Sequence, residues 1–212
     1  MKTLSKAIAI ASLVTAGALT SQAANAEVEY SAQIDSSYLY RGENIGGNAA
    51  LFSGAIDYSH DSGFYAGAWI ANSPEYDLYA GYAMEVGEVS IDVGAITYVY
   101  PGAGVGEDTA PFDGMEAYIN LGFMGASLSY NAGFESLEDT TYIALGYELD
   151  AVSLTYGMVD ADTGGEYTHF DIAFGLNEEL SLTLSTAMDD DDNSYGIEED
   201  TQVILTYALP IK

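Results

Sequence analysis

Five carboxylates lie on the polar side of segments in which apolar residues recur at every second position, and they are the chain's first candidates for chemistry. Their neighbours on that side are mostly Ser, Gly, Thr and Asn, which are small and polar. Carboxylates gathered on one polar face attract cations and polar solutes, because their negative potentials add. The five residues are Asp35, Asp57, Asp92, Glu116 and Asp171.

One basic residue belongs to the same kind of face. Beyond the N-terminal segment, Arg41 and Lys212 are the only basic residues of the chain. Arg41 has the same parity as Gln33 and Asp35, so it continues the polar side of that segment. Its planar guanidinium can bind both oxygens of a carboxylate at once. We expect it to tie a loop carboxylate to this face, and the alternative is a solvated loop residue.

The two histidines do not form a catalytic or metal site in this pattern. His60 precedes a tight turn and His169 follows a longer connection, so the two lie at opposite ends of the strands and cannot share a metal ion. His169 and Asp171 could form the His–Asp pair of a hydrolase, but such a site needs a Ser or further acids in register. A satisfied polar pair is the alternative. We predict that the chain is not an enzyme and has no metal centre or cofactor.

A strongly acidic stretch near the C-terminus invites comparison with a calcium loop. An EF-hand loop that began at Asp189 would need Gly at its sixth position and Glu at its twelfth. The chain has Ser194 and Asp200 there, and no later start within the run fits either. Loose binding of divalent cations by this external loop stays open, beside the simpler interpretation of a solvated charge run. The acidic residues are Asp189, Asp190, Asp191, Asp192, Glu198, Glu199 and Asp200.

Residues 1–26 have the layout of a cleaved secretory signal peptide. Lys2 and Lys6 precede an apolar run, and Ala24 and Ala26 supply the small-residue cleavage pattern. That run is shorter than the roughly 20 residues that a transmembrane helix needs. Residues 27–212 then form one domain, which carries all 33 acidic residues. Nucleic acid is not an expected partner of such a chain, because its phosphates would be repelled.

The patterning after residue 26 predicts an all-β fold. The chain is 49% hydrophobic, with 18 Tyr, 23 Gly and no Cys, and no run of 18 apolar residues follows the signal. Because apolar residues recur at every second position rather than at helical spacing, the segments are typical of strands. Twelve strands are predicted, at residues 28–40, 49–60, 64–71, 76–85, 89–100, 115–122, 126–133, 140–149, 152–160, 167–176, 180–187 and 201–209.

The connections between these strands alternate in length. Every second one is a tight turn, such as Asp61-Ser62-Gly63, and the others are longer loops, such as residues 42–48 and 101–114. Barrels of the bacterial outer membrane have this asymmetry, with short periplasmic turns and longer external loops. A soluble secreted β-sandwich, the alternative fold, gives no reason for it. We predict a transmembrane up-and-down antiparallel barrel of about 12 strands, in the outer membrane of a Gram-negative bacterium.

Aromatic residues near the predicted strand ends suggest two girdles at the lipid–water boundaries, as in other outer-membrane barrels. The group toward the loops would be Tyr38, Tyr40, Tyr76, Tyr98, Tyr100, Tyr118, Tyr130 and Tyr142. The group toward the turns would be Tyr30, Tyr58, Phe64, Tyr82, Phe123, Tyr147, Phe174 and Tyr207. Outer-membrane lipid is then the expected surrounding of the barrel, and the five carboxylates should face the lumen, since a charge in lipid costs several kcal/mol.

Four motifs in the first half of the mature chain resemble a known family. They are SYLYRG at residues 37–42, DYSHDSGFYAGAW at 57–69, DLYAGY at 77–82 and YVYPG at 98–102. In this order they resemble the TorF-type porins, small proteobacterial outer-membrane proteins, whereas the second half is similar only in its strand pattern. The resemblance implies a barrel that conducts small solutes and implies no catalytic or ligand residues. The chain departs from the usual pattern of such barrels by ending in Ile211 and Lys212 rather than an aromatic residue.

These observations together predict a passive channel for small hydrophilic solutes. Five inward carboxylates against one Arg give the lumen a negative potential, so cations should pass more readily than anions. The predicted pore-lining residues are Asp35, Arg41, Asp57, Asp92, Glu116 and Asp171. The alternative is a non-conducting structural or adhesive barrel whose acidic external loops bind divalent cations or a partner.

Overall fold

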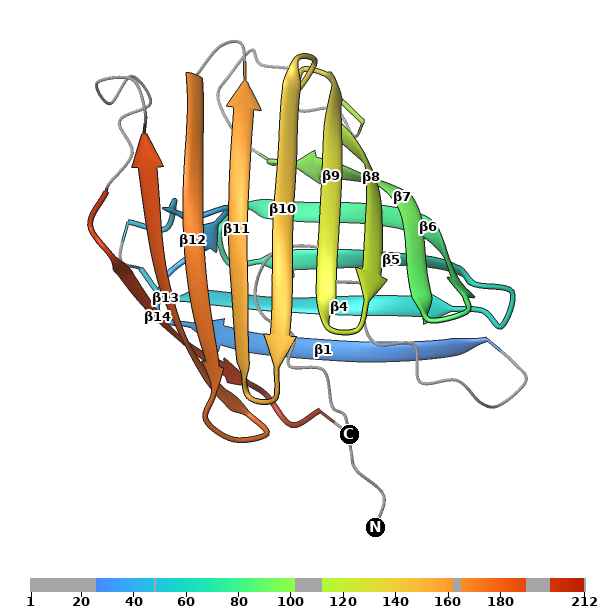
Figure 1. Ribbon diagram of the computed structural model, residues 1–212, viewed down its shortest axis with the longest axis horizontal. Helices are drawn as coiled ribbons and strands as arrows, with labels where there is room; N and C mark the ends of the chain where they lie inside the picture. Colours follow the sequence, from blue (N-terminus) through green and yellow to red (C-terminus); the bar gives the residue numbers. More distant parts are fainter. Residues whose placement is uncertain (1–25, 48, 102–111, 162–164, 190–198, 212) are drawn as a thin grey trace.

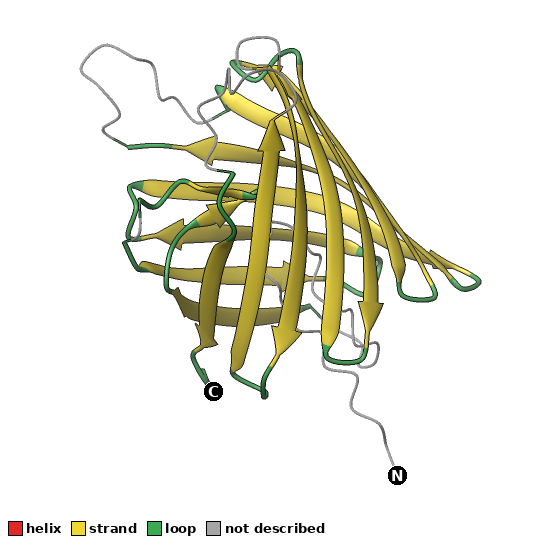
Figure 2. Cartoon of the chain, turned by 60° about the vertical axis from the view of Figure 1, so that its left-hand side comes forward, coloured by secondary structure: helices red, strands yellow, loops and turns green. Residues whose placement is uncertain are grey.

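The computed structural model describes residues 26–47, 49–101, 112–161, 165–189 and 199–211. Twelve of its strands close into an antiparallel barrel, whereas β2 and β3 form a separate two-stranded sheet (Figure 1, Figure 2). No helix among the described residues is long and apolar enough to cross a membrane. The strands are β1 (Glu27–Asp35), β2 (Leu39–Tyr40), β3 (Glu43–Asn44), β4 (Leu51–Ser59), β5 (Phe64–Ala71), β6 (Glu75–Val86), β7 (Val89–Val99), β8 (Gly114–Phe123), β9 (Ala126–Glu135), β10 (Thr140–Leu149), β11 (Val152–Ala161), β12 (Gly165–Gly175), β13 (Leu180–Asp189) and β14 (Gln202–Ala208).

Every barrel strand pairs with its neighbours along the chain, so the topology is up-and-down. The barrel closes between β1 and β14, where Gln33 pairs with Ala208, Ile34 with Tyr207 and Asp35 with Thr206. In Figure 1, β10, β11 and β12 run upright while β1, β4 and β5 cross behind them at a large angle, as the tilt of barrel strands requires. The predicted all-β barrel of about 12 strands is confirmed, and the predicted alternative of a β-sandwich is wrong.

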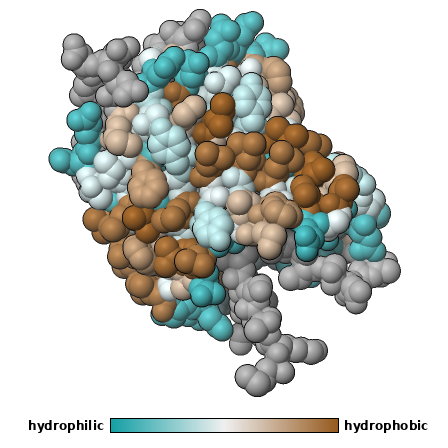
Figure 3. Space-filling model, viewed as in Figure 1, coloured by the Kyte–Doolittle hydropathy of each residue, from teal (hydrophilic) through white to brown (hydrophobic). Residues whose placement is uncertain are grey.

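The barrel has an apolar outside and a polar inside. Large apolar side chains are exposed along the outward positions, and Figure 3 shows them as a broad belt with hydrophilic residues toward its edges. Buried polar side chains occupy inward positions of the same strands, including Asp35, Asp92, Glu116 and Ser185. This reversal of the usual soluble pattern is the arrangement of an outer-membrane barrel. Exposed outward residues include Val28, Phe52, Ile56, Ile70, Val93, Leu128, Leu145, Leu154, Val203 and Leu205.

The predicted girdles are half right. On the turn side, Tyr30, Phe64, Tyr82, Phe123, Tyr147 and Tyr207 are exposed on the outer face as predicted. On the loop side, the prediction is wrong for Tyr38, Tyr98, Tyr118 and Tyr142, which are buried inside the barrel. A tyrosine has an apolar ring and a hydrogen-bonding hydroxyl, so it suits either a lipid boundary or a polar interior. Strand parity separates the two environments, because Tyr98 has the parity of Asp92 and Tyr118 that of Glu116, both of which face inward.

The first predicted strand is too long, and this error concerns the site. β1 ends at Asp35, after which Ser36 bonds the β14 backbone in both directions: its N–H donates to Leu205 O, and its Oγ accepts from Leu205 N–H, both at 2.9 Å. The chain then leaves the wall and forms the β2–β3 hairpin, in which Leu39 pairs with Asn44 and Tyr40 with Glu43.

The turn of this hairpin carries Arg41. Arg41 has φ 46° and Gly42 has φ 87°, the two left-handed residues that a type I′ hairpin turn needs. Arg41 was predicted to continue the polar side of the first strand, and that placement is wrong because the hairpin lifts it off the wall. The guanidinium reaches the interior from the tip of a loop instead. We call residues 38–46 the lumen hairpin.

Candidate functional site

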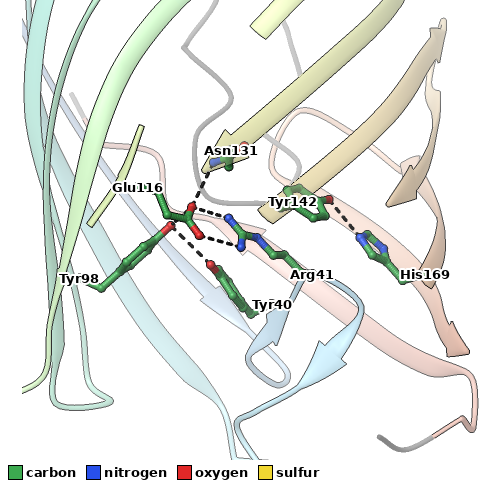
Figure 4. A network of polar contacts seen from close by, with 7 residues as sticks. All are labelled: Tyr40, Arg41, Tyr98, Glu116, Asn131, Tyr142 and His169. Atoms are coloured by element: carbon green, nitrogen blue, oxygen red, sulfur yellow. Dashed lines mark hydrogen bonds and ion pairs between the residues drawn. The ribbon is translucent and has the colours of Figure 1, made fainter. Parts of the chain in front are cut away.

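Arg41 and Glu116 form a bidentate ion pair inside the barrel. Arg41 Nη1 donates to Glu116 Oε1 at 2.9 Å, and Nη2 donates to Oε2 at 2.5 Å (Figure 4). Only 10% of the Arg41 side chain and 2% of the Glu116 side chain are exposed. The predicted fork-like pairing of Arg41 therefore exists, but with the roles exchanged. The loop carries the cation, and the barrel wall, at β8, carries the carboxylate.

Glu116 accepts two further hydrogen bonds on Oε2. Tyr98 Oη donates at 3.0 Å and Asn131 Nδ2 at 3.1 Å, from the strands on either side of β8. The Tyr40 hydroxyl of the hairpin donates in turn to Tyr98 Oη at 3.4 Å. Buried ionised groups are tolerated when hydrogen bonds satisfy their remaining lone pairs, and Glu116 meets that condition.

The opposite side of Arg41 faces aromatic rings. Its guanidinium carbon lies 4.3 Å from the ring centre of Tyr142 and 4.9 Å from that of Tyr40, which is cation–π geometry. Tyr142 continues the contact to β12: its hydroxyl lies 3.0 Å from His169 Nε2, and the two rings stack with centres 5.8 Å apart. Arg41 thus connects β8 to β10, and through Tyr142 to β12.

The hairpin backbone also fits against the wall. A side chain at Gly42 would drive its Cβ into the Cβ of His169, so only glycine can occupy this position without displacing the histidine. At the base, Ser37 Oγ donates to Asn44 Oδ1 at 2.5 Å, and Asn44 Nδ2 donates to Gln202 Oε1 of β14 at 3.1 Å. The lumen hairpin is therefore held from several strands at once.

Burial changes the titration of the hairpin groups. It raises the pKa of the Tyr40 hydroxyl to about 12, so this group stays a donor at neutral pH. Burial also raises the pKa of the Glu43 carboxyl above its usual value. Burial alone would lower the pKa of the Arg41 guanidinium, but the oxygens of Tyr40 and Glu116 raise it, so Arg41 keeps its charge.

His169, Asp171 and Ser185 lie together; the sequence indicates the pairing of His169 with Asp171 but not Ser185 beside it. Ser185 Oγ donates to Asp171 Oδ1 at 2.5 Å, and Asp171 Oδ2 lies 3.1 Å from His169 Nδ1, although not in hydrogen-bond geometry. In a catalytic triad the histidine stands between the serine and the acid. Here the acid stands in the middle and Tyr142 occupies the other nitrogen, so His169 cannot take the serine proton. The β12–β13 register, which pairs Asp171 with Ser185, is the signal that was needed.

The remaining predicted carboxylates also lie on the inner face, each with its own partners. Asp35 accepts from Thr206 Oγ1 at 2.5 Å and from Gln33 Nε2 at 2.9 Å. Asp92 accepts from Tyr65 Oη at 2.6 Å and from Asn120 Nδ2 at 3.1 Å. Tyr79 Oη donates to Asp57. The fold does not bring these acids to one point but distributes them around the wall.

Two further inward acids were not predicted. Glu75 and Asp77 lie on β6 and are 4% and 0% exposed. Asp77 alternates with Tyr76 and Leu78 in the sequence, so the parity that identified the other carboxylates applies to it as well. The signal was therefore present. Glu75 lay outside it only because the predicted strand began one residue too late.

The other predicted polar groups are not part of this cluster. Glu199 and Asp200 are exposed, whereas Asp190, Asp191, Asp192 and Glu198, and the side chain of Asp189, lie outside what the structure describes. His60 Nδ1 lies 2.9 Å from Ser62 Oγ in the exposed turn between β4 and β5. Within the described ranges, no three His, Cys, Asp or Glu side chains are grouped so as to hold a metal ion.

Solved structures similar to this chain are barrels. A KdgM porin in complex with disordered oligogalacturonate has a TM-score of 0.50 and 9% identity, covering 88% of this chain and 100% of its own. Outer membrane phospholipase A from Escherichia coli has a TM-score of 0.47 and 11% identity, covering 86% and 89%. A mutant of Rh. blastica porin has a TM-score of 0.47 and 13% identity, covering 75% and 55%. At these identities the likeness concerns the fold alone.

Sequence comparison identifies the family. No curated protein matches the chain. A family model described as "Bacterial protein of unknown function (Gcw_chp)" matches residues 20–204, which include every barrel strand except the end of β14. The chain, which forms the barrel and its inward hairpin, therefore belongs to the Gcw_chp family.

Proposed function

We propose that the protein is an outer-membrane channel for small hydrophilic solutes, that it favours cations, and that the lumen hairpin narrows its external end. The observation that carries this proposal is the charge of the inner face. Asp35, Asp57, Asp77, Asp92 and Asp171 face inward, and Arg41, whose charge Glu116 neutralises, is the only Lys or Arg among the described residues. A wall of that composition attracts cations.

The exposure of inward side chains supports a channel that is open from the periplasmic end. Near the turns, Glu29, Ser31, Ser90, Ser127 and Glu148 are exposed, although their parity places them on the inner face. Near the loops, inward residues such as Glu116, Tyr142 and His169 are buried against the hairpin. This contrast supports a lumen that is open at the turn end and narrowed by the hairpin at the loop end.

The resemblance to TorF-type porins, which rests on residues between 37 and 102, agrees with this proposal. Two of its motifs include Arg41 and Tyr98, which the fold brings to Glu116. The porin with the similar fold was solved with an oligogalacturonate, a polyanion. The carboxylates of the present wall would repel such a solute, so we propose neutral and cationic solutes instead.

The second candidate function is a non-conducting barrel with a structural or adhesive role. The bidentate latch between Arg41 and Glu116 favours it, because a hairpin held this firmly could close the lumen completely. Its acidic external loop would then bind divalent cations or a partner. In that case the wild-type barrel carries no current, while replacement of residues 38–46 by a short Gly-Ser linker opens it.

Planar-bilayer recording of the refolded protein tests both candidates. We expect small, frequent currents and a reversal potential on the cation side in a potassium chloride gradient. Migration that changes on heating serves as the folding control, so that a silent sample is known to contain folded barrels. An anion-selective reversal potential, or silence of both the wild type and the linker variant, would contradict a channel function of this kind.

A further inference from the structure

The two unpredicted acids on β6 form a site that the hairpin latch does not use. Glu75 and Asp77 are two residues apart on one strand, so their side chains point to the same face. They stand at the loop end of the wall, where Glu75 pairs with Ala71 of β5 and Asp77 pairs with Trp69. Both are at least nine-tenths buried. Two carboxylates are thus held together away from bulk water.

Asp77 differs from the other buried inward carboxylates, Asp35, Asp92 and Glu116. Both of its oxygens are buried, and neither has a hydrogen-bond partner among the residues that the structure describes. An ionised carboxylate that is buried without partners costs several kcal/mol, so something must compensate it. Protonation would remove the charge, but it would supply no donor to the second oxygen. A cation that binds the carboxylate oxygens directly would satisfy Asp77.

The described residues around the pair supply oxygen atoms but no positive charge. The hydroxyl groups of Tyr38 and Tyr100 lie beside the Glu75 carboxylate. Ser53 Oγ is a further buried oxygen without a partner, and it stands in one row with Glu75 across Ala71. Hard cations such as calcium bind carboxylate, hydroxyl and water oxygens, and calcium tolerates irregular geometry.

We propose that Glu75 and Asp77 bind one divalent cation of the calcium type inside the barrel wall. The protein supplies two carboxylates, which match the charge of such an ion, and hydroxyl groups and water complete its shell. Tyr38 begins the lumen hairpin, so the ion would attach the base of the hairpin to β6. The Arg41 latch attaches the tip of the same hairpin to β8. This site is distinct from the external acidic loop and does not depend on whether the barrel conducts.

Calcium titration of the refolded barrel in detergent tests the proposal. We expect Asp77→Asn to lower the affinity of one calcium site at least about tenfold, given that loss of even an outer-shell partner costs about 10–100-fold. Glu75→Gln should act in the same direction. Asp35→Asn is the matched control, because Asp35 is equally buried but already accepts two hydrogen bonds. It should leave both affinity and stoichiometry unchanged.

The number of sites separates this pair from the external loop, which can also take up calcium. Asp77→Asn should remove one site and leave the others, and it should abolish that part of the calcium-dependent rise in the unfolding temperature. If Asp77→Asn misfolds, Glu75→Gln supplies the same readout. Equal stoichiometry and equal affinity in the wild type, Asp77→Asn and Glu75→Gln would overturn the proposal, and so would a wild type that shows no calcium-dependent rise.

Discussion

The barrel wall carries a buried, inward carboxylate both at Glu116 and at Asp77, but the negative charges of the two carboxylates are compensated differently. Both carboxylates face inward from barrel strands, both are buried, and only β7 separates their strands. Glu116 accepts four hydrogen bonds, two of them from Arg41, whereas Asp77 accepts none. The hairpin accounts for part of the difference, since it brings Arg41 to β8. The neighbouring strands account for the rest, because Tyr98 of β7 and Asn131 of β9 donate to Glu116, and no such donor reaches Asp77 within the described part of the chain.

The largest expected effect comes from breaking the ion pair between Arg41 and Glu116. Glu116→Gln would leave the Arg41 guanidinium buried beside Tyr142 without a counter-charge, and breaking one partner of a buried pair costs about 3–5 kcal/mol. We expect the free energy of unfolding to decrease by up to that amount, unless the hairpin leaves the lumen and exposes Arg41 to water. Departure of the hairpin would appear as a larger and noisier single-channel current. Urea unfolding and bilayer recording measure the two outcomes.

The double variant Arg41→Ala/Glu116→Gln is the control for this prediction. It removes both charges, so it should be more stable than Glu116→Gln alone, and the two substitutions should be strongly non-additive. Strict additivity of the two single effects would mean that the ion pair contributes nothing. Arg41→Lys should keep the charge but lose the bidentate geometry, and we expect it to restore stability only in part.

The next effect tests the fit of the hairpin rather than its charge. Gly42→Ala would force a Cβ against His169 at a residue with φ 87°. Overpacking costs about 1–3 kcal/mol, and the left-handed backbone adds about 1–2 kcal/mol for a residue with a Cβ. Gly47→Ala is the matched control, because Gly47 has φ 56° but no atom within 4 Å of the point that its Cβ would occupy. It should show the backbone cost alone, measured by urea unfolding; equal losses would exclude a tight contact at Gly42.

The strands of the barrel wall could be predicted from the sequence, whereas the lumen hairpin could not, for a physical reason. A strand with one face toward lipid must alternate, so residues such as Val93 and Leu205 fix both the strand and its outward face. The tight turns then fix the strand order. The local sequence after Asp35 does not indicate that the chain turns into the lumen. The inward position of the hairpin is stabilised by the contact of Arg41 with Glu116, which lies 75 positions away in the sequence.

The errors in the aromatic girdle have a different origin. Tyr98 and Tyr142 were predicted to belong to it because they lie near strand ends, but their hydroxyls bond Glu116 and His169 inside the barrel. Parity within the strand places both residues inward, since Tyr98 has the parity of Asp92 and Tyr142 that of Glu148. Asp77 is a similar case, because its own strand is enough to place it.

A smaller effect is expected from replacing Asp77, whose charge has no counter-charge or hydrogen-bond donor among the described residues. A hydrogen bond typically contributes about 0.5–1.5 kcal/mol to stability. Asp77→Asn removes a charge but breaks no hydrogen bond among the described residues, so it loses no such contribution. With divalent cations chelated, we expect an unfolding free energy that is unchanged or slightly higher than that of the wild type. Asp35→Asn, which disturbs the bonds from Thr206 and Gln33, should instead lower it. A loss in Asp77→Asn as large as in Glu116→Gln would remove the contrast between the two carboxylates.

The smallest expected effect concerns the pH response of the hairpin. Burial raises the pKa of the Glu43 carboxyl, so the docked hairpin holds this proton more tightly than an undocked one does. The resulting contribution to docking is fully present below the usual Glu pKa of about 4.3 and is lost as the pH rises through the raised value. Acidification from neutral pH should therefore reduce the current noise of the wild type more than that of Glu43→Gln.

Two comparisons serve as controls for this prediction. The difference between the wild type and Glu43→Gln cancels the titration of the other acids. Glu148→Gln, at an exposed inward position, should respond as the wild type does. Parallel pH responses in the wild type and Glu43→Gln would show that Glu43 does not sense the docking of the hairpin.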